Sequence, residues 1–167
     1  MLRMGEIASR GAPAVFNEGQ ERGGGVACGI SKGASYAAAI AEVALDRSGR
    51  ARVTRLWCVH DCGLVINPDQ VRAQREGNLV WGIGMVLLDE LPVEGGRVIA
   101  ETFGDAPIPR MMEVPPITVE LFQSNRSPTG ASETVIVVGP GAIANAIRAA
   151  TGRRPARFPL QTEELAT

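Results

Sequence analysis

The sequence has few aromatic residues and no excess of charge of either sign. Aromatic residues make up 4% of the 167 residues, which argues against a base-stacking platform or an aromatic-lined pocket. The formal net charge is −1, and Lys and Arg are scattered among Asp and Glu. Because this balance leaves no basic face for a phosphate backbone, we do not expect nucleic acid as a partner.

Cysteine and long apolar runs are also scarce. The three cysteines, Cys28, Cys58 and Cys62, are an odd number, which argues against a disulfide framework and predicts reduced thiols. The longest uncharged apolar runs, at 80–88 and 135–147, are too short to cross a bilayer, so no membrane span is expected. The first residues lack the apolar stretch of a secretory signal. The expected compartment is therefore a reducing cytoplasm.

The composition that is present suits one globular domain. An apolar fraction of 45% is enough to build a single packed core in a chain of this length. Residues 1–24 mix glycine, charge and single apolar residues, which is typical of a flexible segment. We therefore expect the folded domain over 25–160, followed by a tail at 161–167.

Hydrophobic periodicity predicts the first half of this domain. Apolar residues alternate over 35–46 and again over 53–60, with turn residues between the two runs. This pattern predicts an antiparallel hairpin at the centre of a sheet. Asn67 and Pro68 are typical of a helix start, and the apolar spacing after them predicts a long helix over 68–88 that packs across the sheet.

The second half mixes strands with a short helix. Residues 97–103 and 117–122 are predicted strands, and the proline-rich crossing between them must be extended. Residues 140–150 are predicted to form a short helix that ends at Gly152. Because strands and helices do not alternate regularly, the predicted fold class is α+β, with a mixed or antiparallel sheet and packed helices.

Cys58, His60 and Cys62 are possible ligands of a soft metal ion. In a strand, however, alternate residues are separated by about 6.6 Å, whereas the ligands of one zinc ion converge to about 2.0–2.3 Å from it. Buried thiols on a sheet face are the preferred interpretation. The glycine-rich segments at 23–25 and 139–141 match neither the P-loop nor the dinucleotide-binding fingerprint.

Glu133 follows Gly130 and directly precedes the apolar run 135–138. A carboxylate at the edge of a buried segment can be desolvated, which raises its pKa and suits a general base. The alternative is a turn charge that precedes a core strand at 135–138. Spacing alone favours that alternative, so residue types leave the chemistry open.

Several short segments together are more specific than any of these motifs. They are Gly25-Val26-Ala27, Ala34-Ser35-Tyr36-Ala37-Ala38, Ala41-Glu42-Val43, Asp61-Cys62-Gly63, Ile66-Asn67-Pro68-Asp69, Val71-Arg72-Ala73-Gln74, Glu76-Gly77, Trp81-Gly82, Ala144-Asn145-Ala146-Ile147 and Ala149-Ala150-Thr151-Gly152. Through them the chain resembles the C-terminal part of the molybdopterin-binding subunit of the xanthine dehydrogenase and aldehyde oxidase superfamily. It is most similar to the isoquinoline 1-oxidoreductase beta-subunit group.

The resemblance implies a component of a molybdenum hydroxylase. Such an enzyme binds a molybdopterin cytosine dinucleotide and oxidises a small-molecule substrate, an N-heterocycle or an aldehyde, with oxygen derived from water. A [2Fe–2S] subunit would take the electrons, because the three cysteines offer no ligand set for such a cluster. The upstream half of the molybdenum subunit would complete the cofactor site.

The resemblance also implies site residues. Glu133 lies fourteen residues before Ile147, as the base of the family does, and so takes the role of general base. Two residues depart from the family pattern, because Ser132 and Thr134 stand where glycine and proline are usual. Gln74 and Glu133 are expected on one side of the domain. The implied cofactor-binding residues are Gln74, Gly130, Ala131 and Ser132.

Two interpretations of the chain stay open at this point. In the first, the chain is a catalytic component that assembles with the upstream half and the iron–sulfur subunit. In the second, it is a truncated, non-catalytic module for cofactor binding or assembly, with no activity alone. In either case the isolated chain is expected to expose an apolar surface and to self-associate.

Overall fold

A computed structural model describes residues 22–31 and 34–160 of the chain. The predicted tail at 161–167 lies outside these residues, as does the predicted flexible segment up to residue 21. The first strand, β1 (Arg22–Ser31), begins before the expected domain boundary at residue 25. Gly23 and Gly24 therefore belong to the sheet and not to the N-terminal segment.

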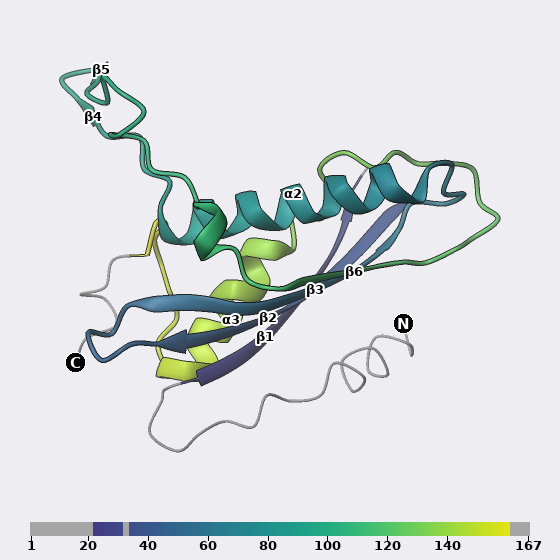
Figure 1. The fold of residues 1–167 in the computed structure, drawn as a ribbon, viewed down its shortest axis with the longest axis horizontal. Coiled ribbons are helices and arrows are strands. Elements are labelled where there is room, and N and C mark those ends of the chain that lie inside the picture. Colours follow the sequence, from purple (N-terminus) through teal and green to yellow (C-terminus); the bar gives the residue numbers. More distant parts are fainter. Residues whose placement is uncertain (1–21, 32–33, 161–167) are drawn as a thin grey trace.

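The centre of the fold is a four-stranded mixed sheet in the order β1-β2-β3-β6 (Figure 1). The other three strands are β2 (Ser35–Leu45), β3 (Ala51–Asp61) and β6 (Ile117–Leu121). β2 pairs antiparallel with both β1 and β3, and β6 pairs parallel with β3. The predicted central hairpin, the predicted strand at 117–122 and the α+β class with a mixed sheet are thereby confirmed.

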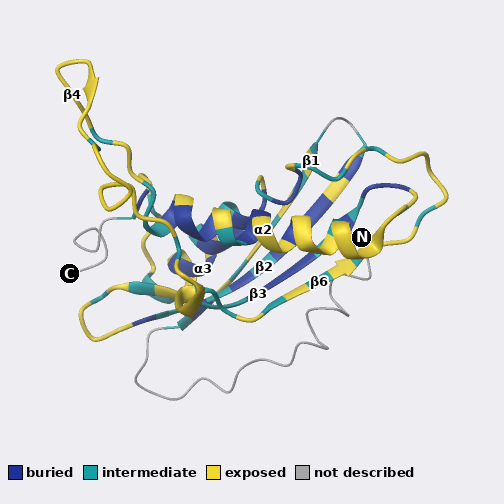
Figure 2. Cartoon of the chain, turned by 45° about the horizontal axis from the view of Figure 1, so that its top comes forward, coloured by how far each residue is buried: buried dark blue, intermediate teal, exposed yellow. Residues whose placement is uncertain are grey.

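Two helices cover one face of this sheet (Figures 1 and 2). α2 (Pro68–Leu87) contacts β3 and β6, and α3 (Gly139–Thr151) contacts β1, β2 and α2. The side chain of Asn67 caps α2 by accepting a hydrogen bond from the Gln70 amide at 3.1 Å. Gly152 ends α3 with a φ of 72°. Both predicted helices are confirmed.

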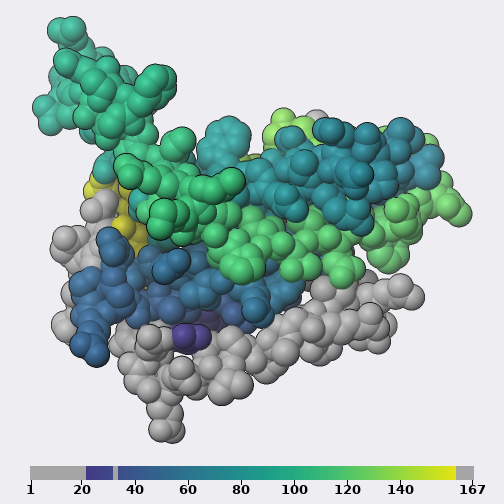
Figure 3. Space-filling view, viewed as in Figure 1, coloured from purple at the N-terminus to yellow at the C-terminus, as the bar shows by residue number. Residues whose placement is uncertain are grey.

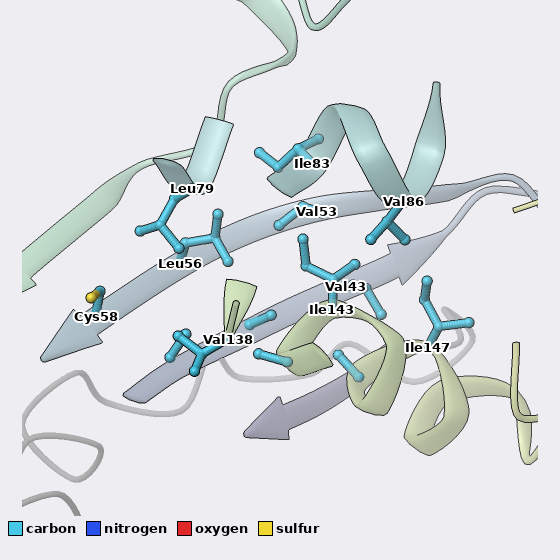
Figure 4. Close-up of a cluster of buried hydrophobic side chains, with 14 of the residues drawn as sticks. Val43, Val53, Leu56, Cys58, Leu79, Ile83, Val86, Val138, Ile143 and Ile147 are labelled. Atoms are coloured by element: carbon cyan, nitrogen blue, oxygen red, sulfur yellow. The ribbon is translucent and has the colours of Figure 1, made fainter. Parts of the chain in front are cut away.

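The hydrophobic core lies between the helices and the covered face of the sheet (Figure 4). Leu56 from β3, Leu79 from α2 and Ile143 from α3 are all fully buried there. Removing such a side chain from water contributes about 1.5–3 kcal/mol to the free energy of unfolding. This packing fixes the position of α2 over β3, on which the candidate site depends.

The glycines of β1 allow α3 to approach the sheet closely. A Cβ atom on Gly25 would lie 2.2 Å from the backbone nitrogen of Ala146, and one on Gly23 would lie 2.1 Å from the Ala146 carbonyl oxygen. No side chain fits at either position. The same glycines made the segment resemble a linker, because glycine is depleted in strands.

Residues 89–113 form an extended arm whose hairpin projects from the body of the molecule, whereas its end at 111–113 lies back against the body (Figures 1 and 3). Its tip is a two-stranded hairpin of β4 (Val93–Glu94) and β5 (Arg97–Val98). A single turn of 3-10 helix, η1 (Met111–Glu113), precedes β6. The proline-rich crossing is therefore not extended throughout, because η1 lies within it.

The predicted strand at 97–103 is wrong beyond Val98. The Asp105 carboxylate accepts hydrogen bonds from the backbone N–H groups of Glu101 and Thr102, at 3.2 and 2.9 Å. These bonds fold the chain into a turn and replace the ladder that a strand would need. The large apolar side chains of this segment, Val98, Ile99 and Phe103, are exposed.

Candidate functional site

The candidate site is built where the loop 129–134 meets the first half of α2. The Gln74 side chain donates a hydrogen bond from Nε2 to the carbonyl oxygen of Ser132 at 3.3 Å. The next residue of α2, Arg75, donates from Nη2 to the carbonyl oxygens of Ala131 and, at 3.2 Å, of Ser132. Two adjacent residues of the helix thus hold the backbone that leads into Glu133.

Glu133 is exposed, and its carboxylate accepts a hydrogen bond from the Ser132 hydroxyl. Gln74 contacts the residue directly before Glu133, so the two implied functional residues lie at one place although they are far apart in sequence. The burial that we expected around the Glu133 carboxylate is not provided by the described residues.

The segment after Glu133 is a turn and not a core strand. The Ile136 amide donates to the Glu133 carbonyl oxygen at 3.1 Å, and the Val138 amide donates to the Val135 carbonyl oxygen at 3.1 Å. Val135 and Val138 are buried, whereas Val137 is exposed. The predicted core strand at 135–138 is therefore wrong. Its apolar side chains serve to seat a tight turn that leads into α3.

The other flank of Glu133 is held by buried side chains of the sheet. The Thr134 hydroxyl lies 2.9 Å from the Ser35 hydroxyl, which lies 2.9 Å from Nε2 of His60. All three side chains are buried. Burial, and then the nearby positive charge of Arg75, lowers the pKa of His60 to about 4, against the opposing effect of Asp61. The imidazole is therefore neutral at neutral pH.

An open groove of about 650 Å³ runs beside this loop. One wall carries the apolar side chains of Leu64, Val65 and Ile66, and the backbone of the loop forms part of the rim. Gly130 has a φ of 92° and open space around the position of a Cβ atom. The polar side chains that line the groove include the amides of Asn67, Gln70 and Gln74. All the residues implied to bind the cofactor line it, namely Gln74, Gly130, Ala131 and Ser132.

An ion pair fastens one end of the groove. Asp61 pairs with Arg126 at 2.7 Å and accepts hydrogen bonds from the Gly63 amide and the Ser124 hydroxyl. Partial burial raises the pKa of Asp61, but the bonds from Gly63 and Arg126 outweigh it and leave the pKa below its ordinary value. The Thr129 amide also donates to the carbonyl oxygen of Cys62 at 2.9 Å. The two loops that border the groove are thus joined.

The interpretation of Cys58 and Cys62 as buried thiols holds for both residues. Cys58 is part of the core, and burial raises the pKa of its thiol to about 12. Cys62 is buried at the groove, and burial raises its pKa as well. Cys28 is exposed. Within residues 22–31 and 34–160, no group of three His, Cys, Asp or Glu side chains could hold a metal ion.

Sequence reasoning did not find Arg75 or Thr134 as parts of the site. Arg75 is a charged residue in a helix, which normally indicates a solvated face, yet its side chain is fully buried. The sequence alone could not place Ser35 or His60 beside a partner. The contact between Ser35 and Thr134 spans about a hundred residues and has no local signal in the sequence.

Comparison with known proteins identifies the family. A model of the molybdopterin cofactor-binding domain matches residues 16–115. A subunit of nicotinate dehydrogenase from Pseudomonas putida is 37% identical over 135 residues, which are 80% of this chain and 11% of that protein. The beta subunit of isoquinoline 1-oxidoreductase from Brevundimonas diminuta is 34% identical over 146 residues, which are 84% of this chain and 19% of that protein.

Solved structures show the same fold. Quinoline 2-oxidoreductase from Pseudomonas putida 86 matches with a TM-score of 0.71 and 28% identity, over 78% of this chain and 18% of that chain. Aldehyde oxidoreductase from Desulfovibrio desulfuricans also matches with a TM-score of 0.71 and 28% identity, over 78% of this chain and 15% of that chain. The chain belongs to the molybdopterin cofactor-binding domain family of the xanthine dehydrogenase and aldehyde oxidase superfamily.

The chain spans only about a tenth to a fifth of the length of these curated relatives. The family model covers Gln74 but ends before the loop that carries Glu133. Among the residues that the structure describes, no helix is long and apolar enough to cross a membrane.

Proposed function

We propose that this chain forms one wall of the cofactor site of a molybdenum hydroxylase, which oxidises an N-heterocycle or an aldehyde with oxygen derived from water. The observation that carries the proposal is the hydrogen bond from Gln74 to Ser132 at the groove. This bond joins α2, where the family resemblance places the cofactor-binding Gln74, to the loop that carries the proposed base, Glu133.

The groove suits a pterin chemically. The edges of a pterin carry both N–H donors and carbonyl or ring-nitrogen acceptors, and the amides of Asn67, Gln70 and Gln74 can serve both kinds of group. Gly130 leaves its backbone accessible from the groove. In the proposed enzyme a molybdopterin cytosine dinucleotide, when bound, supplies the oxidising chemistry. Gln74 and the backbone of Gly130, Ala131 and Ser132 would hold it.

Glu133 is the proposed general base. Its carboxylate is exposed in this chain, so it can reach a bound reactant, and the hydroxyl of Ser132 restrains its rotamer. The desolvation that suits a base would be added by the cofactor, the substrate or another polypeptide. A positioned base of this kind contributes about 10²–10⁴ to a rate.

The proposed enzyme needs further polypeptides. The chain covers a small part of the curated relatives, so the upstream half of the molybdenum subunit would provide the opposite wall of the groove. The sequence has three cysteines, of which two are buried, so a separate [2Fe–2S] subunit would carry the electrons away. The cytoplasm is the proposed compartment.

A non-catalytic cofactor-binding or assembly module is the second candidate. It is favoured by one observation: Ser132 and Thr134 replace the usual glycine and proline on both sides of Glu133, and the Ser132 side chain bonds to the Glu133 carboxylate. A site that has lost its activity could carry such changes without cost.

The two candidates differ in the effect of Glu133→Gln. We would purify the chain with the polypeptides that assemble with it and measure molybdenum content and turnover of N-heterocycles and aldehydes. If Glu133 is the base, the variant keeps its molybdenum and loses turnover by about two orders of magnitude or more, because the amide keeps the shape but cannot take a proton. Glu120, exposed on β6, offers a matched control, and Glu120→Gln should change neither quantity. Unchanged turnover in Glu133→Gln at full metal content would favour the non-catalytic module.

A further inference from the structure

Glu133 is an exposed side chain on a loop, yet the residues on both sides of it are attached to buried polar groups. On one side, Arg75 and Gln74 bind the carbonyl oxygens of residues 131 and 132. On the other side, Thr134 is buried and bonded through its hydroxyl to Ser35. The backbone of Glu133 is therefore fixed at both ends by different elements, α2 and the sheet.

Burying the Arg75 side chain to hold this loop is energetically unfavourable. The side chain is fully buried, and its Nε and Nη1 atoms have no hydrogen-bond partner in the described structure. Its hydrogen bonds go to neutral carbonyl groups, and burial lowers its pKa although the negative charge of Glu133 acts in the opposite direction. Desolvating a cation for such partners costs free energy that an apolar side chain of similar size would not cost. Stability alone does not explain an arginine at this position. The loop that it holds does.

The Ser35–His60–Thr134 cluster is likewise a group of buried polar side chains whose hydrogen bonds are only partly satisfied. A neutral imidazole and two hydroxyls occupy a site enclosed by core residues, and Nδ1 of His60 has no partner in the described structure. With the proton on Nε2, His60 donates to Ser35 and leaves only an acceptor unpaired, which is the cheaper arrangement. The cluster then runs as a chain of directed bonds from β3 through β2 to Thr134.

We propose that Arg75 and the Ser35–His60–Thr134 cluster are positioning residues that preorganise the Glu133 loop. The inference deepens the proposed function, since a base acts only at a fixed place and a small displacement of a reacting group is costly in rate. The buried side chains of Val135 and Val138 seat the turn after the loop, and the polar bonds fix the backbone directly before and after Glu133. Preorganisation of the backbone is separable from the chemistry of Glu133.

The test uses hydrogen exchange of the 167-residue chain in two variants. Thr134→Val removes the hydroxyl and keeps the shape, and Arg75→Met removes the guanidinium and keeps much of its volume. We expect the amides of Ile136 and Val138, which are bonded within the turn, to exchange about tenfold faster in each variant, as expected for the loss of one buried hydrogen bond. The free energy of urea unfolding should fall by no more than the same amount, about 1 kcal/mol, because one buried hydrogen bond is lost from the folded chain. A general loss of packing would instead lower it by more than this and speed exchange throughout the core by a correspondingly larger factor.

Conservative and distant substitutions control the experiment. Thr134→Ser keeps the hydroxyl and should restore slow exchange, whereas Thr54→Val removes a hydroxyl bond to the Glu42 carbonyl elsewhere on the sheet and should leave the turn unchanged. The proposal is overturned if Ile136 and Val138 exchange at the wild-type rate in Thr134→Val and Arg75→Met. It is equally overturned if Thr134→Ser exchanges as fast as Thr134→Val.

Activity provides a second, separable readout. In the assembled enzyme Thr134→Val should lower kcat about tenfold with little change in KM or molybdenum content, and it should add no further loss in a Glu133→Gln background. If Glu133→Gln itself has no effect, the proposed base is wrong, while the exchange measurement still decides whether the loop is held. Independent losses from Thr134→Val and Glu133→Gln would show that Thr134 does not act through Glu133.

Discussion

His60 couples the stability of the domain to pH, and it is the single histidine of the sequence. Its pKa falls from an ordinary value of 6.5 to about 4 because it is buried near Arg75. At a pH between these two values, His60 is therefore protonated in the unfolded chain and neutral in the folded chain. The contribution of His60 to the free energy of unfolding is fully present above its ordinary pKa. It is lost as the pH falls toward the pKa in the folded chain.

The expected loss is about 2 kcal/mol of unfolding free energy between about pH 7 and pH 5, a range in which ordinary carboxylates stay ionised. Urea unfolding at a series of pH values measures it. His60→Gln, which can still donate a hydrogen bond to Ser35 but does not titrate, should flatten the curve over this range. A wild-type curve that is already flat would show that His60 is not held neutral.

The residues of the site divide according to how far the sequence could predict them. The resemblance selected Gln74 and Glu133, and the structure brings the first against the neighbour of the second. Arg75 and Thr134 were not predicted, because their roles depend on contacts that cross 56 and 99 residues of sequence. Only the folded sheet and helix bring these residues within hydrogen-bonding distance.

At the scale of elements, the contact between β1 and α3 gives a sharp test. Gly25→Ala would place a Cβ atom 2.2 Å from the backbone of Ala146, so α3 must move away from the sheet. Overpacking against a rigid backbone costs about 1–3 kcal/mol or more. Gly24→Ala is the matched control, because no atom lies within 4 Å of its Cβ position. Thermal or urea unfolding of the two variants measures the difference, and equal stabilities would show that α3 does not seat on β1 as described.

The elements that periodicity predicted well are those with one buried face. β2, β3 and α2 each alternate or repeat their apolar residues against a single core, and their predicted ranges agree with the structure. β1 was not predicted as a strand, because its glycines meet a helix backbone and carry no apolar signal. The predicted strand at 97–103 failed for the opposite reason, since its apolar residues form no part of the core.

At the scale of the whole molecule, the packing within this chain does not account for the arm at 89–113. A two-stranded hairpin in water is marginally stable at best, yet this one projects from the body without a covering layer (Figure 3). Phe103 is 99% exposed, Met111 89% and Met112 91%. Exposed apolar residues of this size concentrated on one segment are typical of an interaction surface. In the proposed enzyme, the upstream half of the subunit would cover it.

Without that cover, the isolated chain should self-associate through the arm. Burial of these side chains against a second copy removes apolar surface from water, which is the dominant favourable contribution to association. A triple variant, Phe103→Ser, Met111→Ser and Met112→Ser, should therefore shift the chain toward monomer, because it lowers the apolar area that association can bury. Sedimentation velocity over a range of concentrations measures the shift.

Val137→Ser, at an apolar residue that is 60% exposed on the body, controls for a general gain in solubility and should leave the association unchanged. A wild-type chain that stays monomeric at high concentration would contradict the prediction, and a triple variant that associates as strongly as the wild type would move the contact from the arm to another face.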